Sequence, residues 1–225
     1  MAATDTATTR GRLDRQQVLQ AALDYADRNG LDALSMHKLG AALGVKAMSL
    51  YNHVANKEDL LAGVVDLLWS RVALPAPGTD TWAAHVRALA HSLREVIGSH
   101  PHLAPLFTSG QTLSTHSMRV AEAYRAALVT AGLPEPDAVG FLRTVTAYAI
   151  GQTLAELTWS QAAVQGDADQ LTRIRQVTNL LPPDASDDLI RTALWFCADC
   201  DLSAQFELGI DLMIRGLEAT LAAER

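Results

Sequence analysis

The chain has 225 residues, of which 49% are hydrophobic, and it carries a formal net charge of −7. This length allows a small domain and a larger one, and the apolar content is enough for a packed core. No apolar run approaches the roughly 18 residues that span a bilayer, and the polar N-terminus has no signal-peptide core, so we expect a cytoplasmic protein without membrane contact. The acidic balance argues at first against nucleic acid as a partner.

The charge is unevenly distributed along the chain. Residues 1–71 carry eight Lys and Arg against eight Asp and Glu, whereas residues 72–225 carry ten against 17. All three lysines, Lys38, Lys46 and Lys57, lie in the first part. Because a local basic face decides nucleic-acid binding and the global charge does not, the first part remains a candidate for DNA binding.

Apolar residues recur at intervals of three and four throughout the chain, which predicts an all-α fold. Residues 13–73 form the first expected domain, and Asp14, Ser35 and Asn56 are expected N-caps because their side chains accept hydrogen bonds from free amides. Asp14 has Gln17 three positions later, as a capping box requires. We expect the first helix of this domain at about residues 14–29 and the last at about 56–71.

The segment Pro75–Gly78 interrupts the helical pattern and marks the expected domain boundary. Residues 79–225 form the second expected domain, and the polar residues 1–12 form a disordered arm. Residues 165–186 are expected to be a long connection. In the second domain we expect helices at about 81–99, 100–107, 114–131, 136–161, 187–197 and 202–222.

The stretch Leu34–Leu61 predicts two short helices joined by a tight turn, followed by a third helix. Leu39 and Leu43 share one helix face, and Gly44 supplies the turn without a steric penalty from a Cβ atom. The second helix exposes basic and polar side chains around the apolar Leu50, as suits a helix in a DNA major groove. An ordinary helical hairpin would leave these exposed side chains unexplained, so we interpret the stretch as a helix-turn-helix.

This motif resembles the signature of the TetR family of bacterial regulators, in the run LGV, the helix ending LYNHV and the following NKEDLL. The segment LDRQQVLQAALDYADRNG is similar to the first helix of that family. Three later segments resemble the regulatory domain of the tetracycline repressor branch, in the same order: DTWAAHVRALAHSLREVI, FLRTVTAYAIGQTLAEL and FELGIDLMIRGLEATL. The resemblance covers most of residues 13–221. It implies an N-terminal DNA-binding domain and a C-terminal domain for effector binding and dimerisation.

The resemblance implies a ligand-responsive transcriptional regulator and no enzymatic activity. We expect a repressor that binds a palindromic operator and leaves it when a small, mostly apolar or aromatic effector binds. The effector is expected to favour a dimer conformation whose two reading heads no longer fit two successive major grooves. One alternative is a regulator that answers to a protein partner or to redox state through Cys197 and Cys200. An all-α enzyme is the alternative from another class, but the sequence shows no nucleophile–base pair and no metal cluster.

The predicted DNA contacts divide by the chemistry of their side chains. Lys57 and the first amides of its helix suit a phosphate, and Tyr51 and His53 are further phosphate donors. Lys46 is the candidate reader of guanine. Ala47 or Met48 is the candidate contact to a thymine methyl group. The full set is Ser35, His37, Lys38, Lys46, Ala47, Met48, Ser49, Tyr51, Asn52, His53 and Lys57.

Three positions in this region depart from the family pattern. Met36 stands where a phosphate-binding Thr is common, His37 where an Arg often reads a base, and Asn52 where an aromatic residue is common. We therefore expect an operator that differs from the standard tet operator.

Polar and aromatic side chains recur on helices that are expected to converge in the second domain, as a small-molecule pocket requires. The predicted effector contacts are Trp82, His85, Leu89, Leu93, His102, Phe107, Gln111, Thr112, Met118, Tyr124, Leu142, Gln152 and Trp159.

By alignment with the family, the residues that hold a drug–magnesium chelate in tetracycline repressors are replaced here by Phe107, Leu89 and Ala73. The histidines also lack the spacing of a metal site. We therefore expect an apolar pocket that needs neither metal nor cofactor.

Small residues lie at close-approach spacing on two helices that pair with their twins in the family. Their interpretation as a homodimer interface also fits a palindromic operator, since each groove needs its own reading head. The predicted interface residues are Gly140, Ala147, Gly151, Ala155, Gly209, Leu212 and Gly216.

Overall fold

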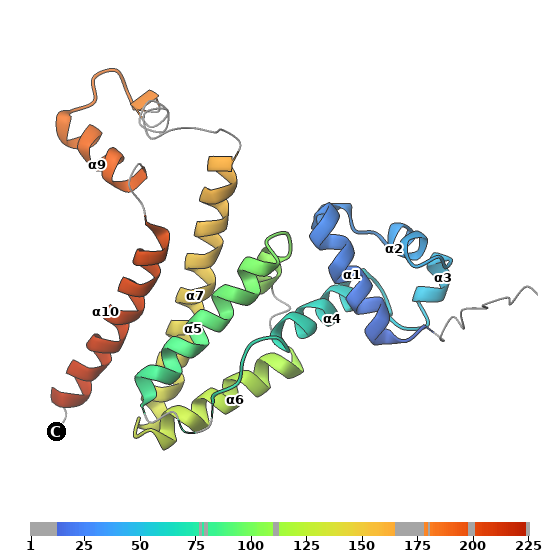
Figure 1. The fold of residues 1–225 in the computed structure, drawn as a ribbon, viewed down its shortest axis with the longest axis horizontal. Coiled ribbons are helices and arrows are strands. Elements are labelled where there is room, and N and C mark those ends of the chain that lie inside the picture. Colours follow the sequence, from blue (N-terminus) through green and yellow to red (C-terminus); the bar gives the residue numbers. More distant parts are fainter. Residues whose placement is uncertain are drawn as a thin grey trace, which may run out of the picture. The chain divides into compact units, whose positions relative to one another are not determined.

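The computed structural model describes residues 13–76, 78, 81–109, 113–164, 178–179, 181–197 and 201–223. Within these residues the regular structure is helical, which confirms the all-α prediction (Figure 1). The elements are α1 (Arg15–Asn29), η1 (Leu31–Ala33), α2 (Met36–Ala42), α3 (Ala47–Leu50), α4 (Lys57–Trp69), α5 (Trp82–Ser99), η2 (Ala104–Thr108), α6 (Thr115–Thr130), α7 (Glu135–Val164), α9 (Asp187–Cys197) and α10 (Leu202–Ala223).

The three predicted N-caps are present. The Asp14 carboxylate accepts a hydrogen bond from the Gln17 amide at 2.7 Å, and the Gln17 side chain accepts one from the Asp14 amide at 3.0 Å, which completes the capping box. Ser35 and Asn56 cap α2 and α4 by accepting from amides three residues later, at 3.3 and 2.8 Å. These local interactions explain why the starts of the N-terminal helices follow from the sequence.

Two of the expected segments differ from the structure or lie largely outside its described residues. The predicted short helix at residues 100–107 is instead the 3-10 helix η2, which begins at Ala104 and has a proline in its first turn. Most of the expected connection at residues 165–186 lies outside the described residues.

The chain forms two compact units that are not continuous in sequence. The first unit comprises Met1–Arg71 and His100–Met118, and the second comprises Val72–Ser99 and Arg119–Arg225. We expected a single boundary at Pro75–Gly78, which assigns residues 100–118 to the second domain. In the structure this segment instead packs with α1 and α4, because its apolar and histidine side chains find partners there.

Those partners are specific. The ring of Phe107 lies 5.6 Å from the ring of Trp69, at the end of α4. His116 donates its backbone amide to one carboxylate oxygen of Asp66 at 2.8 Å, and its ring Nδ1 lies 2.8 Å from the other. Burial raises the pKa of Asp66, but the hydrogen bonds from His116 and Ser114 together more than offset this effect and hold the pKa below its usual value. An ionised Asp66 therefore anchors the start of α6 on α4.

A second histidine ties the same segment to α1. The Nδ1 atom of His100 lies 2.7 Å from the Asp27 carboxylate, and its Nε2 atom lies 2.6 Å from the Arg71 guanidinium. Because a guanidinium can only donate, Nε2 must accept, so Nδ1 carries the proton and donates to Asp27. The arrangement therefore requires a neutral imidazole in one tautomer.

In the second unit, α5 packs against α7, and α10 contacts both (Figure 1). The buried face of α5 contributes Leu89 and Leu93 to the core. Arg94 forms a bidentate ion pair with Glu156 of α7, at 2.6 and 3.0 Å, and its guanidinium lies 4.7 Å from the ring centre of Phe206 of α10. One arginine thus joins all three helices.

Within the described part of the chain, we find no helix that combines the length and the apolar character needed to span a membrane.

Gly209 is needed for close packing between α10 and α7. A Cβ atom at this position would lie 2.0 Å from Oη of Tyr148 and 2.3 Å from its Cζ. The Tyr148 ring cannot retreat easily, because its hydroxyl donates to the carbonyl oxygens of Gln205 and Phe206 at 3.0 and 3.1 Å.

We therefore predict that Gly209→Ala lowers the free energy of unfolding by about 1–3 kcal/mol, the usual effect of overpacking. Thermal or denaturant unfolding measures this loss. Gly98→Ala on α5 is the control, because a Cβ atom there meets no atom within 4 Å. If both variants are equally stable, the contact with Tyr148 does not constrain position 209.

Candidate DNA-reading surface and effector site

The turn between α2 and α3 depends on two glycines. Gly44 adopts a φ of +68°, a conformation that other residues rarely take. Gly40 is buried, and a Cβ atom there would lie 3.0 Å from the carbonyl oxygen of Val45 and 3.1 Å from the amide of Ala47. Its role in bringing α3 close to α2 was not found from the sequence, because nothing local distinguishes a glycine inside a helix.

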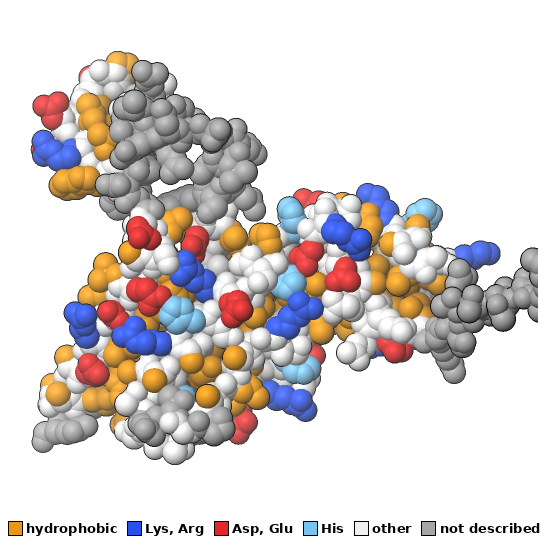
Figure 2. Space-filling model, in the orientation of Figure 1, with side chains coloured by type: hydrophobic (Ala, Val, Ile, Leu, Met, Phe, Trp, Pro, Cys, Tyr) orange, Lys and Arg blue, Asp and Glu red, His pale blue; other side chains and the backbone are white. Residues whose placement is uncertain are grey.

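The helix α3 has one buried side and one exposed side. Leu50 is fully buried, whereas Met48 and Tyr51 are 73% and 45% exposed. The predicted readers Lys46 and Asn52 are also exposed, and the remaining predicted contacts of this region are at least partly exposed: Ser35, His37, Lys38, Ala47, Ser49, His53 and Lys57. The whole predicted set is thus accessible to DNA, and Figure 2 shows Lys, Arg and His side chains on the surface of this unit.

An interaction missed in the sequence holds the segment between α3 and α4 in place. The Arg15 guanidinium donates to the carbonyl oxygen of His53 at 2.6 Å and to both carboxylate oxygens of Asp59 at 2.7 and 3.1 Å. Asp59 also accepts from the Ala55 amide at 2.8 Å. The hydrogen bonds from Arg15 and then from Ala55 lower the pKa of Asp59 to about 2, so this carboxylate stays charged at neutral pH. No sequence motif relates Arg15 to residues 38 and 44 positions later.

The predicted effector contacts fall into three groups by exposure. Trp82 and Gln152 are partly exposed, and the exposed members are His102 and Met118. Gln111, Thr112 and the side chain of Trp159 lie outside the described residues. The buried members are His85, Leu89, Leu93, Phe107, Tyr124 and Leu142.

The structure does not gather this set into one unit. His102, Phe107 and Met118 belong to the first compact unit, and the other described members belong to the second. In the second unit, the Trp82 ring lies edge-on to Phe141 at 5.8 Å.

Two buried polar side chains of the second unit, Tyr124 and His85, differ in their hydrogen bonding. The Tyr124 hydroxyl donates to the carbonyl oxygen of Ala73 at 3.0 Å, and burial raises the pKa of Tyr124 to about 12. His85 is 5% exposed, and its Nδ1 atom has no hydrogen-bond partner among the described residues. Because buried polar atoms are nearly always paired, His85 is the better candidate for a ligand contact and Tyr124 serves the fold.

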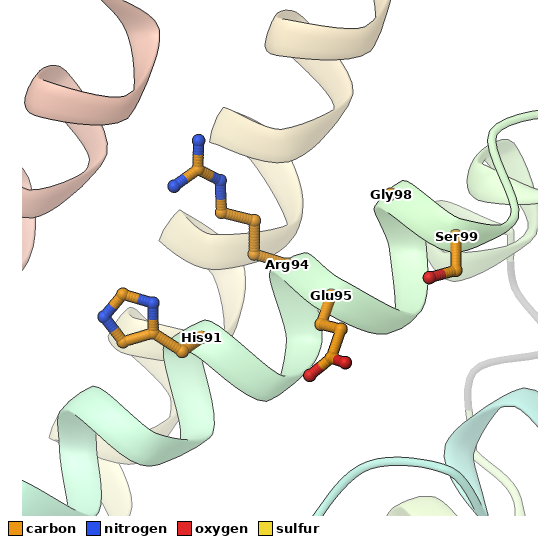
Figure 3. Close-up of a pocket in the computed structure, with 5 residues that line it drawn as sticks. All are labelled: His91, Arg94, Glu95, Gly98 and Ser99. Atoms are coloured by element: carbon orange, nitrogen blue, oxygen red, sulfur yellow. The ribbon is translucent and has the colours of Figure 1, made fainter.

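The structure also has an open depression of about 480 Å³ on α5, lined by His91, Arg94, Glu95, Gly98 and Ser99 (Figure 3). None of these residues was predicted as an effector contact. Its arginine is already paired with Glu156. The depression therefore differs in its lining residues from the effector site that the sequence predicts.

The predicted dimer residues are largely accessible in the single chain. On α7, Gly140, Ala147 and Gly151 are exposed and Ala155 is partly exposed. On α10, Leu208 and Leu212 are 56% and 60% exposed, Gly216 is exposed and Gly209 is partly exposed. Both helices therefore present small and apolar side chains to solvent, although Gly209 also has the internal role beside Tyr148.

Among the described residues, no three His, Cys, Asp or Glu side chains are grouped in a way that would hold a metal ion. The side chain of Cys197 and all of Cys200, the predicted alternative redox pair, lie outside the described residues.

Two family descriptions match the chain. Residues 18–64 match the family "Bacterial regulatory proteins, tetR family", and residues 74–221 match "Tetracyclin repressor-like, C-terminal domain". The chain is 31% identical over 217 residues to an HTH-type transcriptional regulator of Saccharopolyspora erythraea, covering 96% of this chain and 89% of that protein. It is 29% identical to the class A tetracycline repressor from transposon 1721 of Escherichia coli, covering 92% and 91% of the two chains.

Solved structures give the same result for the fold. ActR of Streptomyces coelicolor without ligand superposes with a TM-score of 0.78 at 28% identity, covering 95% of this chain and 98% of that chain. Its complex with actinorhodin gives 0.77 at 28%, covering 93% and 97%. The matches span both the DNA-binding and the regulatory segments, and the chain belongs to the TetR family of bacterial transcriptional regulators.

Proposed function

We propose that this regulator is a repressor, and that its homodimer leaves a palindromic operator when a small, mostly apolar or aromatic effector binds. Several relatives carry the name of transcriptional repressor, among them DrrR1 of Streptomyces coeruleorubidus, which is 32% identical over 155 residues. Such a repressor acts on its operator DNA in the cytoplasm. As a TetR-family member the chain is a transcriptional regulator and not an enzyme.

The proposal that the protein binds DNA through α3 is supported best by the contrast between the buried and the exposed side of this helix. Leu50 is fully buried while Met48 is 73% exposed, so the neighbouring Lys46, Ser49 and Asn52 face outward from a fixed scaffold. This is the arrangement that a recognition helix needs in a major groove. The N-terminus of α4, with Lys57 at its first position, supplies amides and a positive charge for a backbone phosphate.

The dimer part of the proposal rests on the exposed faces of α7 and α10. Small residues on α7 allow close approach of a second helix, and Leu208 and Leu212 of α10 supply apolar area. A two-fold dimer presents two reading helices to half-sites about 34–36 Å apart, one turn of DNA.

The proposal that a small effector binds to this protein is supported by its relatives and by His85. ActR has been solved in complex with actinorhodin, and the present chain shares its fold. His85 is buried, and its Nδ1 atom has no partner within the described part of the chain, so a ligand atom would satisfy it. An effector acts by binding more tightly to the dimer conformation that does not fit the operator, and by that difference shifts the population.

Two lysine variants test the DNA-reading surface and serve as controls for each other. Lys57→Ala should weaken binding to every DNA sequence and reduce the salt slope by about one, because one phosphate contact is lost. Lys46→Ala should instead relax the base preference, by about 1–3 kcal/mol at the cognate position. Binding-site selection followed by titrations at several salt concentrations separates the two effects. A loss confined to one base pair in Lys57→Ala would make this residue a base reader and contradict the assignment.

His85→Phe tests the effector site. We expect effector affinity to fall about tenfold, or roughly 1.4 kcal/mol, because the ring nitrogen is lost, while operator affinity without effector stays normal. A thermal-shift screen of apolar aromatic compounds, with and without chelator, provides the ligands. Tyr124→Phe is the control, and it should lower stability without changing effector affinity, because its hydroxyl is used by Ala73. Binding that chelator abolishes would contradict the metal-free proposal.

A further inference from the structure

The helical turn of α3 continues beyond its last regular residue and carries Asn52 on its outer side. The amides of His53 and Val54 both donate to the carbonyl oxygen of Leu50, at 2.9 and 3.0 Å. Leu50 and Val54 lie four residues apart and are 0% and 2% exposed, so they define the buried side of this turn. Asn52 is exposed and lies two residues from each, which is about 200° around a helix. Its side chain therefore lies on the side opposite the core.

The usual structural roles of an asparagine do not account for Asn52. Asparagine is frequent in turns because it tolerates a positive φ and bonds to nearby backbone groups. Among the described residues only glycines have a positive φ, so the backbone does not require an asparagine here.

The carboxamide of Asn52 also has no hydrogen-bond partner in the part of the chain that the structure describes. The asparagines on either side of it in sequence differ in this respect. Asn29 donates to the carbonyl oxygen of Tyr25 at 2.8 Å, and Asn56 accepts from the Asp59 amide at 2.8 Å. Asn52 thus presents both a donor and an acceptor to solvent.

The position of Asn52 on the helix favours base edges over phosphates. Met48, four residues earlier, is 73% exposed and shares this outer side. When a recognition helix lies in a major groove, the side opposite its buried side faces the base edges, whereas its flanks face the phosphates. Asn52 and Met48 therefore lie where sequence is read.

We infer that Asn52 is a specificity-determining residue that reads an adenine in each half of the operator. The inference rests on the proposed function, in which α3 lies in the major groove. The carboxamide oxygen accepts from the N6 amino group of adenine, and the amide nitrogen donates to N7. Guanine presents two acceptors at these places, and the pyrimidines have no N7. The family resemblance does not supply this role, because an aromatic residue is common at this position.

Replacing adenine by 7-deazaadenine in the DNA tests this contact at a single atom. The change removes the N7 acceptor and keeps the Watson–Crick edge, so the duplex stays paired. The full-length protein first selects its operator from random duplexes. Each adenine of that operator is then replaced in turn, in both half-sites. Fluorescence anisotropy gives the dissociation constants for the wild-type protein, for Asn52→Ala and for Met48→Ala.

We expect one adenine whose replacement weakens binding of the wild-type protein about tenfold, because one hydrogen bond is lost in each half-site. Asn52→Ala should bind the normal and the modified operator equally. In a selection of its own, it should also lose the preference for adenine at that position. Met48→Ala is the matched control, since it shortens another exposed side chain on the same side of the helix, and it should keep the tenfold effect.

Three results would overturn the inference. The first is an operator in which no adenine depends on its N7 atom, and the second is an N7 effect that persists in Asn52→Ala. The third is an equal loss of affinity for all sequences in Asn52→Ala, which would make Asn52 a phosphate contact. In each case the protein still binds its operator, so the proposed function stands. A protein that selects no DNA sequence would instead contradict the proposed function, and the role of Asn52 with it.

Discussion

The guanidinium of Arg15 bridges the carbonyl oxygen of His53 and both carboxylate oxygens of Asp59, with nitrogen–oxygen distances of 2.6 to 3.1 Å. Arg15 of α1 therefore fixes both the segment that follows α3, at His53, and the first turn of α4, at Asp59. The segment that ends at His53 carries the candidate base readers, and the first turn of α4 carries the candidate phosphate site. The low pKa of Asp59 keeps the bridge charged well below neutral pH.

The same unit is extended by a segment from much later in the chain. His100 and His116 pair with Asp27 of α1 and Asp66 of α4, and between them the ring of Phe107 packs on Trp69. Any movement of this segment must therefore break or carry these hydrogen bonds to α1 and α4.

What the sequence predicted well was local. Caps such as Asp14 and Asn56 act on neighbouring amides, and the apolar period fixes which side of α3 is buried, so the helix starts and the exposed side of α3 followed directly. What it missed depends on residues far apart in sequence. Arg15 and His53, or Trp69 and Phe107, meet only in the fold, and the assignment of residues 100–118 to the first unit follows from such pairs. The small residues of α10 were ambiguous for the same reason, since Gly209 faces Tyr148 within the chain.

The measurement that tests the central claim most directly is operator affinity in Arg15→Gln, with Arg28→Gln on the same helix as the control. The Arg28 side chain donates to the carbonyl oxygen of Asp24 within its own helix, so its replacement should leave affinity unchanged. If Arg15 positions the reading surface, Arg15→Gln should lower operator affinity roughly tenfold, because charged hydrogen bonds worth about 1.4 kcal/mol are lost. The variant should still unfold cooperatively. Equal operator affinity in the two variants would contradict the claim that Arg15 positions the reading surface.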